Sequence, residues 1–573
     1  MGQILVDSIL IRFLDHIYKY TLLEKIGVSI IIFLVFSFTR PGICQTVNFS
    51  STTLPIVLIN TNGIAIPNEP KIVGDMEIIY NGPGKINALT DPNRHFKGKI
   101  GVELRGSTSQ DLSPKKPLGV ETRKEDGETN LNISLLGMPK ENDWILLAPY
   151  SDKSLIRDVL IHRIASEILP YSSRTQMCEL LVNGEYQGVY VLMEKIKRDK
   201  KRVNINELTQ TADSGDSLTG GYILKIDKTT GSTPQGGFNS DYLSGIVSSG
   251  RRTYYQYEEP EADVITAAQK SYIQSLVKSF ESSFFKPNYA DPVEGFRKYV
   301  NENSMIDFLI LNEVANNVDG YRLSTFLYKD VDSKDTRLRF GPIWDFNLGF
   351  GNADYCAGGT TDVLALDFAT RCPQDFWTVP FYWPQVLQDS AFGQNLYDRW
   401  SALRKSTLTD QNVLRLVDSL VGVIGNASIR NFQKWNILSQ YVWPNAYVGG
   451  SYANEIKYLK DWVVKRMIYL DGEFKQLTVP KYYPDRYFDA KVFPNPARPN
   501  QDITFSYYIH DYDHMRFEIF DMTGHHLLTR LDGDHFNGVN QLKTTTFNLP
   551  AGVYIYKVLM TDRLVKAGRI IVL

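Results

Sequence analysis

The strongest pattern in this chain is FLILNEVANNVDGYRLSTFLYKD (residues 308–330), followed by LRFGPIWDFNLGFG (residues 338–351). The apolar run that begins at Phe308 predicts a buried helix ending in a polar loop. The next two apolar segments predict a pair of strands. This order places Asp319 in the loop before the strands and Asp345 directly after them, 26 residues later.

Two carboxylates in this arrangement suit phosphoryl transfer. One accepts the proton of an attacking hydroxyl, and the other holds a hard cation such as Mg²⁺ against nucleotide phosphates. Each carboxylate also has a structural interpretation. Asp319-Gly320 is also a turn sequence, and Asp345 could cap a helix or accept a buried backbone amide. Both interpretations stay open at this point.

Strand patterns precede this region. Apolar or alternating segments at 54–59, 75–80, 99–104, 115–123, 179–182, 188–193 and 221–227 predict strands, and Asn183-Gly184 predicts a tight hairpin. Residues 152–165 have helical spacing, with His162 as a core histidine, and the zones 262–314 and 383–475 are mostly helical. Short strands with turns follow near residue 493 and predict a small antiparallel sandwich. The expected fold class is therefore α+β.

The N-terminus contains a stretch of 13 uncharged residues, 26–38, preceded by Lys25. This length suits a signal peptide with cleavage near Cys44 and is short for a membrane span. The alternatives are a short buried helix or an uncleaved anchor, and the start codon could lie downstream of Met1. We expect no stable transmembrane helix after signal cleavage.

Composition and cysteine content narrow the function classes. The formal net charge of −2 gives no electrostatic attraction to nucleic acid, so none is expected as a partner. Cys178 is expected to be a buried thiol. Cys356 and Cys372 flank a loop and could form a disulfide in an oxidising compartment. No Cys/His spacing matches a zinc site.

Residues 54–474 resemble the CotH kinase family, in the form common in secreted proteins of the Bacteroidetes. The matching motifs include LRGSTSQ (104–110), PKK (114–116), DKSLIRD (152–158), VNGEYQGVY (182–190) and the Asp319 and Trp344-Asp345 loops. The resemblance implies a two-lobed atypical protein kinase fold. Its β-rich lobe would span about 50–230 and its helical lobe about 260–475, within a domain at 45–475. It also implies ATP with Mg²⁺ or Mn²⁺ as cofactors and transfer of phosphate to Ser/Thr of an exported or surface protein.

The resemblance also implies roles for individual residues. Asp319 is the expected catalytic residue and Asp345 the expected metal ligand. Nucleotide contacts are expected from Arg105, Ser107, Ser109, Lys115, Lys116 and Glu194. One position departs from the kinase pattern: Ser324 stands where ordinary kinases carry a metal-binding Asn, and Asn347 could compensate. A catalytically inactive surface protein acting in adhesion or assembly is therefore the alternative function.

The last segment, 492–573, resembles the type A C-terminal sorting domain of the type IX secretion system. The motifs are VFPNP (492–496), FDMTG (520–524), LPAGVY (549–554) and the final KAGRIIVL. With a signal peptide at 1–44 and a linker at 476–491, this implies export through the periplasm and outer membrane to the cell surface or medium. It also implies the type IX secretion machinery as a partner. A carbohydrate-binding or adhesive sandwich is the alternative.

Overall fold

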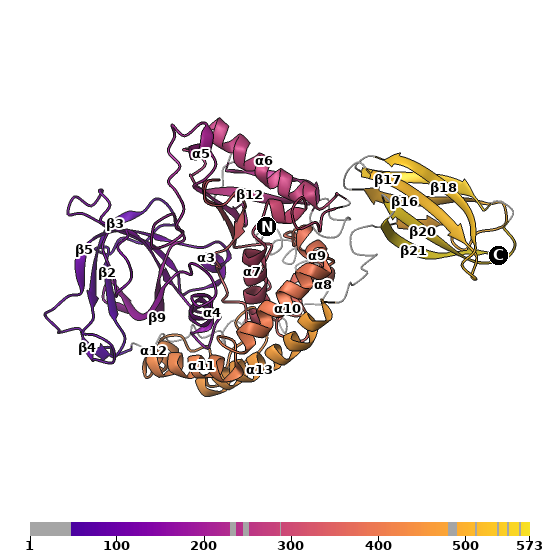
Figure 1. The fold of residues 1–573 in the computed structure, drawn as a ribbon. Coiled ribbons are helices and arrows are strands. Elements are labelled where there is room, and N and C mark those ends of the chain that lie inside the picture. The colour runs from indigo at the N-terminus through magenta and orange to yellow at the C-terminus, as the bar shows by residue number, and fades with distance from the viewer. Residues whose placement is uncertain are drawn as a thin grey trace, which may run out of the picture.

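The computed structural model describes residues 47–229, 236–243, 251–286, 288–478, 490–509, 513–535, 538–546, 549–560 and 563–573. The predicted signal peptide, with Cys44, and most of the predicted linker lie outside the described residues. Mixed helices and sheets make up the described chain (Figure 1), so the α+β class is confirmed.

The first part of the chain forms a closed barrel in the order β2-β3-β5-β6-β7-β9-β8. Its strands are β2 (Ile56–Asn60), β3 (Ile72–Ile79), β5 (Phe96–Leu104), β6 (Leu118–Arg123), β7 (Asp143–Leu147), β8 (Thr175–Val182) and β9 (Glu185–Glu194). Parallel pairing of β2 with β8, with Ile56 opposite Glu179, closes the barrel. A buried core that includes Val57, Val102 and Trp144 fills its interior. Outside the barrel, β1 (Ser51–Thr52) pairs with β4 (Asn87–Ala88).

A second sheet has the order β11-β12-β10-β13-β14, with antiparallel neighbours throughout. Its strands are β10 (Tyr222–Ile226), β11 (Gly237–Leu243), β12 (Arg252–Glu259), β13 (Thr325–Lys329) and β14 (Arg339–Phe340). It joins β10, from the region expected to be the β-rich lobe, to the β13–β14 hairpin. Ile226 lies opposite Thr325, so Asp227 is at the same end of the sheet as Ser324. This register positions the candidate site.

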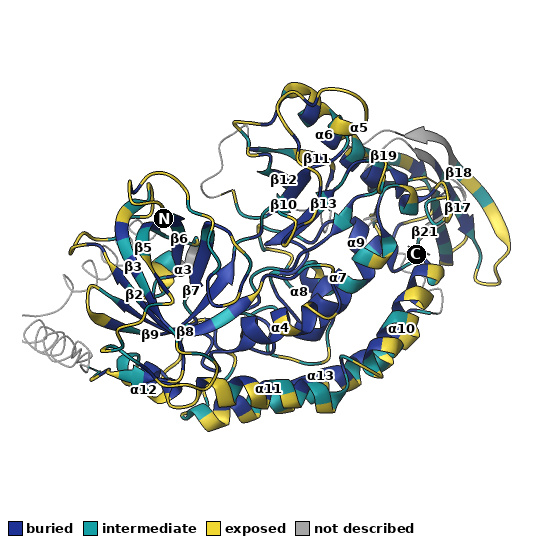
Figure 2. Ribbon diagram, turned by 60° about the vertical axis from the view of Figure 1, so that its left-hand side comes forward, coloured by how far each residue is buried: buried dark blue, intermediate teal, exposed yellow. Residues whose placement is uncertain are grey.

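Helices surround this sheet and extend beneath the barrel (Figure 1). The longer ones are α4 (Arg157–Ala165), α6 (Ala267–Ser283), α7 (Glu302–Ala315), α10 (Ser390–Arg404), α11 (Asp410–Ile424), α12 (Ala427–Lys434) and α13 (Tyr452–Gln476). The short ones are α3 (Thr108–Leu112), α5 (Gly215–Leu218), α8 (Phe368–Arg371) and α9 (Tyr382–Val386), with 3₁₀ turns at Phe296–Lys298 and Ala365–Asp367. In Figure 2, α11 and α13 each show one buried and one exposed face, which is the pattern of surface helices on a core.

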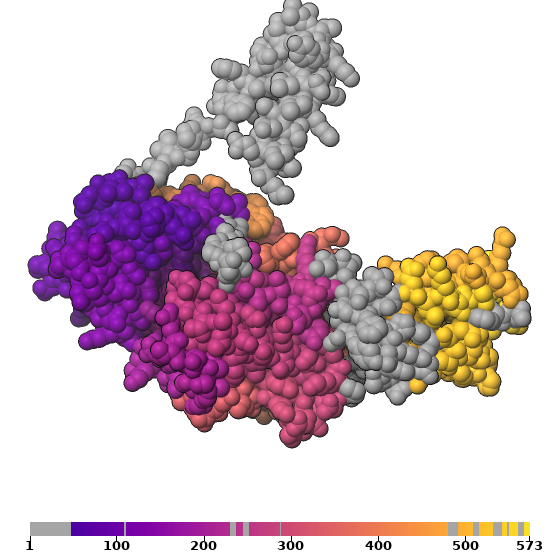
Figure 3. Space-filling view, turned by 90° about the horizontal axis from the view of Figure 1, so that it is seen from above, coloured from indigo at the N-terminus to yellow at the C-terminus, as the bar shows by residue number. Residues whose placement is uncertain are grey.

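The barrel and the helical region are in direct contact. Helix α12 packs on β9 of the barrel, and the two masses lie side by side in Figures 1 and 3. Helix α4 starts at Arg157 rather than at the predicted residue 152, because the Asp152 side chain accepts the backbone N–H groups of Ser154 (3.0 Å) and Arg157 (2.9 Å) and forms a turn before the helix.

The C-terminal segment is rich in strands. One sheet has the order β15-β16-β19 and the other β18-β17-β20-β21. Their bounds are β15 (Ala490–Phe493), β16 (Asp502–Ile509), β17 (Asp513–Phe520), β18 (His526–His535), β19 (Gly538–Thr545), β20 (Gly552–Met560) and β21 (Arg563–Val572). Phe505 of one sheet and Phe517 of the other share a single buried core, with ring centroids 4.6 Å apart.

No single helix in the described part of the chain is long and apolar enough to cross a bilayer. Helices α11 and α12 taken together pass that test of length and composition, and they meet at a bend of 70°.

Candidate phosphoryl-transfer site

The loop between α7 and β13 is fixed by its own sequence. Asn316 ends α7 with a left-handed φ of 44°, and its amide donates to the carbonyls of Ala357 and Thr360 at 3.0 and 3.2 Å. A Cβ on Gly320 would lie 2.3 Å from the Asn312 Oδ1 atom, so only glycine fits here. The Asp319-Gly320 dipeptide is therefore part of a packed loop that presents Asp319 at a set position.

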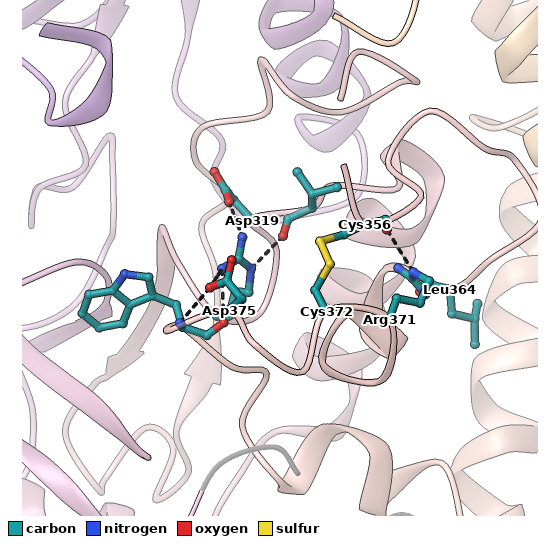
Figure 4. Close-up of a disulfide and its surroundings, with 9 residues drawn as sticks. Asp319, Cys356, Leu364, Arg371, Cys372 and Asp375 are labelled. Carbon is teal, nitrogen blue, oxygen red and sulfur yellow. Dashed lines mark hydrogen bonds and ion pairs between the residues drawn. A yellow bond between two sulfur atoms is a disulfide. The ribbon is translucent and has the colours of Figure 1, made fainter. Parts of the chain in front are cut away.

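The Asp319 carboxylate is held by a neighbouring arginine. Its Oδ1 atom accepts from the Arg322 Nη2 atom at 2.8 Å, and 16% of its side chain is exposed. Arg322 is almost fully buried; it also donates to the Asp375 carboxylate at 3.0 Å and to the carbonyl of Trp377 at 3.2 Å. Its guanidinium lies 3.8 Å from the ring centroid of Phe368. Arg322 is thus fixed on several sides and orients the carboxylate (Figure 4).

A disulfide secures the loop that supplies Asp375. Cys356 and Cys372 are joined, with their Cα atoms 5.8 Å apart. Arg371 bridges the same loop by donating to the carbonyls of Cys356 (2.9 Å) and Leu364 (2.7 Å), as Figure 4 shows. The Asp375 N–H donates to the Cys372 carbonyl at 3.1 Å. A covalent and hydrogen-bonded path therefore runs from the disulfide through Asp375 and Arg322 to Asp319. Cys178 is a buried free thiol, as predicted.

Asp345 follows β14, at the same end of the hairpin as the Asp319 loop, and is half-buried. Its φ is 62°, a left-handed conformation that non-glycine residues rarely adopt and that is enriched at functional sites. Loss of solvent, together with the like charges of Asp319 and Asp227, raises the pKa of Asp345 to about 7. Asp158 of α4 accepts the backbone N–H of Phe346, the residue after Asp345, at 2.8 Å. Burial raises the pKa of Asp158 to about 8.

The structure adds Asp227, which the sequence analysis did not select. It follows β10 directly, and burial, with the charge of Asp319, raises its pKa. Its only sequence signal was an acidic residue at the end of an apolar strand. Sequence alone could not show that β10 would pair with β13 and bring this carboxylate to Ser324 and Asp319.

Arg105 is the predicted nucleotide-contact residue that reaches this site. Its guanidinium lies 5.9 Å from the ring centroid of Trp344, next to Asp345. Burial lowers its pKa, and the charges of Glu258, Glu103, Asp143 and Asp227, largest first, oppose that shift. Ser107 directly precedes the short helix α3, which includes Ser109; the Ser109 side chain lies outside what the structure describes.

Lys115 and Glu194 are not brought to this site. The Lys115 ammonium is buried and donates to the carbonyl of Val189 (2.6 Å) and to the Asn431 Oδ1 atom (2.9 Å), so it links the barrel to α12. Burial lowers its pKa to about 7. Glu194 is buried and paired with Arg174 at 3.0 Å. Both charged groups already have partners inside the protein, and the nucleotide contacts predicted for them stay predictions. Lys116 donates to the carbonyl of Gln110.

The acidic groups suit a hard cation that is shared with a ligand. Within the described chain no three His, Cys, Asp or Glu side chains gather closely enough to hold a metal by themselves. Mg²⁺ typically takes one or two carboxylates and completes its shell with phosphate oxygens and water. The like charges that raise the pKa of Asp345 are what such a cation would neutralise, so Asp345 fits as the protein ligand. Ser324 is buried with a φ of 48°, and Asn347 accepts from the Asn352 side chain through its carbonyl (2.8 Å); their metal roles stay predictions.

Fold and site together define a kinase-like protein of mixed α+β class. The family described as CotH kinase protein matches residues 102–470, and the Secretion system C-terminal sorting domain matches residues 491–573. The chain belongs to the CotH family. The sorting domain marks it for export by the type IX secretion system to the cell surface or the medium, and it implies an interaction with that machinery.

Curated proteins and solved structures add no support for a particular fold or function. No curated protein matches the chain. A solved structure of Pseudomonas fluorescens alkylpurine DNA glycosylase AlkC, bound to DNA containing an abasic site analog, is 12% identical. The match covers 37% of this chain and 59% of that one, with a TM-score of 0.13, which is too low to support any inference about fold or function.

Proposed function

We propose that this protein is an exported kinase that transfers the γ-phosphate of ATP to Ser or Thr of a surface or exported protein, with Mg²⁺ or Mn²⁺. The observation that carries the proposal is that Asp319, which precedes β13, and Asp345, which follows β14, come to the same end of the hairpin, where Asp227 at the end of β10 joins them. In this proposal the barrel is the nucleotide-facing lobe, the helical region is the second lobe, and the C-terminal sheets are a β-sandwich used for sorting.

The residues divide the chemistry between them. The Asp319 carboxylate, oriented by Arg322, accepts the proton of the attacking hydroxyl as that oxygen bonds to the γ-phosphorus. The bond from the γ-phosphorus to the bridging oxygen breaks, and ADP leaves with that oxygen. Asp345 would hold the cation, which supplies charge neutralisation for the phosphates when bound. Arg105 would contact the phosphates, because its guanidinium lies 5.9 Å from the ring centroid of Trp344, the residue before Asp345.

A second function has an observation of its own. Ser324, whose side chain is buried, stands where ordinary kinases carry a metal-binding Asn. This departure favours a kinase fold used for adhesion or surface assembly without catalysis. ATP is also scarce outside the cell, so a catalytic role would be easiest before export is complete.

Phosphoryl transfer from labelled ATP to a mixed protein acceptor tests the two functions. The proposal expects transfer that depends on Mg²⁺ or Mn²⁺ and falls by about 10² or more in Asp319→Asn, since a general base contributes that much. Asp345→Asn should lose metal-dependent nucleotide binding, measured by calorimetry. The matched control is Asp263→Asn, an exposed aspartate remote from the hairpin in sequence. Absence of both ATP binding and transfer in the wild type would leave the adhesive function.

A further inference from the structure

A cavity lies beside the β13–β14 hairpin, apart from the acidic site. Its volume is about 460 Å³, and three segments line it: 169–174, 200–205 and 328–342. None of Asp227, Asp319 or Asp345 is among the lining residues. The volume falls within the range of ligand pockets, which is about 300–1,000 Å³.

The lining of this cavity is strongly basic. Among the described residues around it, seven are Lys or Arg and two are Asp. Glu194 does not line the cavity but adds a third carboxylate, because it pairs with two of the lining residues, Arg174 at 3.0 Å and Arg202 at 3.8 Å. The lining residues and Glu194 together carry seven cations and three carboxylates, a formal charge of +4, in a chain whose net charge is −2. The Asp199 carboxylate lies close by and accepts the Lys201 backbone N–H at 2.6 Å.

The ion pairs within the lining show which of the positively charged side chains lack a carboxylate of their own. Asp335 is shared by Arg337 and Arg339, each at 2.8 Å, so one carboxylate faces two guanidinium groups. Both arginines keep a third or more of their side chains exposed. Lys200 and Lys201 are exposed, and no ion pair within the described chain involves them. Guanidinium and ammonium donors therefore remain available to a ligand.

We propose that this basic pocket binds a phosphorylated Ser or Thr side chain of a polypeptide. A phosphate carries close to two negative charges and three acceptor oxygens, and clusters of arginine are its usual protein partner. The pocket also has apolar and aromatic walls at Tyr171, Val203 and Tyr328, against which the peptide carrying the phosphate can pack. A free phosphate ion would leave most of the 460 Å³ unfilled.

The pocket would extend the proposed kinase function. The inference rests on that function only for the origin of the phosphate on the peptide. Gly341, in the pocket wall, is four residues before Asp345. An extended chain advances about 3.5 Å per residue, so the Cα atoms of Gly341 and Asp345 are at most about 14 Å apart. A protein already phosphorylated at one position would bind here and keep further hydroxyls near the acidic site.

Fluorescence anisotropy with the full chain tests the proposal, and the assay needs no catalysis. The probe is a labelled pentapeptide with one phosphoserine between alanines. Its unphosphorylated and glutamate forms, inorganic phosphate and ATP are separate arms. We expect the phosphopeptide to bind at least 10-fold more tightly than the other two peptides, with affinity falling as salt rises.

Charge-reversal variants then locate the site. Lys200→Glu/Lys201→Glu should weaken phosphopeptide binding 10-fold or more, and both residues are exposed, so folding is preserved. Lys465→Glu/Lys475→Glu, on the exposed face of α13, makes the same charge change elsewhere and should alter affinity less than two-fold. Equal binding of the phosphorylated and unphosphorylated peptides, or no effect of the Lys200/Lys201 change, overturns the proposal. So does ATP or inorganic phosphate displacing the probe at lower concentration than unlabelled phosphopeptide. Loss of phosphoryl transfer with intact phosphopeptide binding would count against the kinase function alone.

Discussion

Reduction of the Cys356–Cys372 disulfide is predicted to weaken both the fold around Asp319 and phosphoryl transfer. The bridged residues are 16 positions apart, so the bond removes loop-closure entropy from the unfolded chain. For a loop of that size the stabilisation is about 3 kcal/mol. We expect the free energy of unfolding to fall by about this amount on reduction.

The effect on activity follows from the hydrogen-bonded path to Asp319. Asp375 is held at Cys372 and anchors Arg322 at 3.0 Å, and Arg322 in turn holds the Asp319 carboxylate at 2.8 Å. A hydrogen bond between charged groups contributes about 1.5–3 kcal/mol, so a freed Asp375 should lower kcat about 10-fold. The KM for ATP should stay within two-fold, because the role proposed for Asp319 is on the acceptor hydroxyl and not on ATP.

Thermal unfolding and single-acceptor kinetics, each with and without dithiothreitol, measure these two effects. The variant Cys356→Ser/Cys372→Ser should match the reduced protein and show no response to dithiothreitol. Cys178 should not interfere, because burial raises the pKa of its thiol to about 12 and keeps it unreactive. The reasoning fails if reduction lowers the melting temperature yet leaves kcat unchanged, since the loop would then be structural only.

Three further predictions concern stability and are measured by urea unfolding. Burial raises the pKa of Glu281 from 4.5 to about 7. The folded state therefore holds this proton more tightly than the unfolded state, so the free energy of unfolding falls as pH rises from about 4.5 to 7. Glu281→Gln should remove that fall and be more stable than wild type by up to about 3 kcal/mol at pH 8, with no difference at pH 4; identical pH profiles would contradict this. Gly320→Ala should cost about 1–3 kcal/mol because its Cβ would clash, whereas Gly422→Ala, in open space within α11, should stabilise by about 0.5–1 kcal/mol; equal effects would refute the packing argument. Arg466→Met should lower the free energy of unfolding by about 3–5 kcal/mol, because it leaves Glu313 buried without its partner at 3.0 Å. Adding Glu313→Leu should recover most of that loss. If stability does not recover, the unpaired charge of Glu313 is not the cause.

The features that sequence predicted well are those set by neighbouring residues. Asn183-Gly184 predicted a hairpin, and both residues have positive φ, at 49° and 80°, between β8 and β9. The helix that ends before Asp319 and the strand that follows were also correct in kind, because apolar periodicity reflects which face is buried. Strands β11 and β12 were not predicted.

Contacts between distant segments could not be predicted in this way. The barrel closes because β2 pairs with β8, about 120 residues later, and local pattern does not encode partner choice. Lys115 looked like a phosphate ligand at a strand start, yet the fold encloses it between the barrel and α12, where carbonyl and amide oxygens satisfy the ammonium.

The sequence by itself determined the export signal at the C-terminus, the family, and the order helix, loop, hairpin that carries Asp319 and Asp345. Those depend on motifs and on residue periodicity, which are local properties of the chain. Only the tertiary structure decided that Asp227 joins them, that Arg322 and the disulfide loop orient Asp319, and that seven basic residues surround one cavity. The physical reason is that charge interactions and hydrogen bonds act over a few ångströms in space, whatever the separation of the residues in sequence.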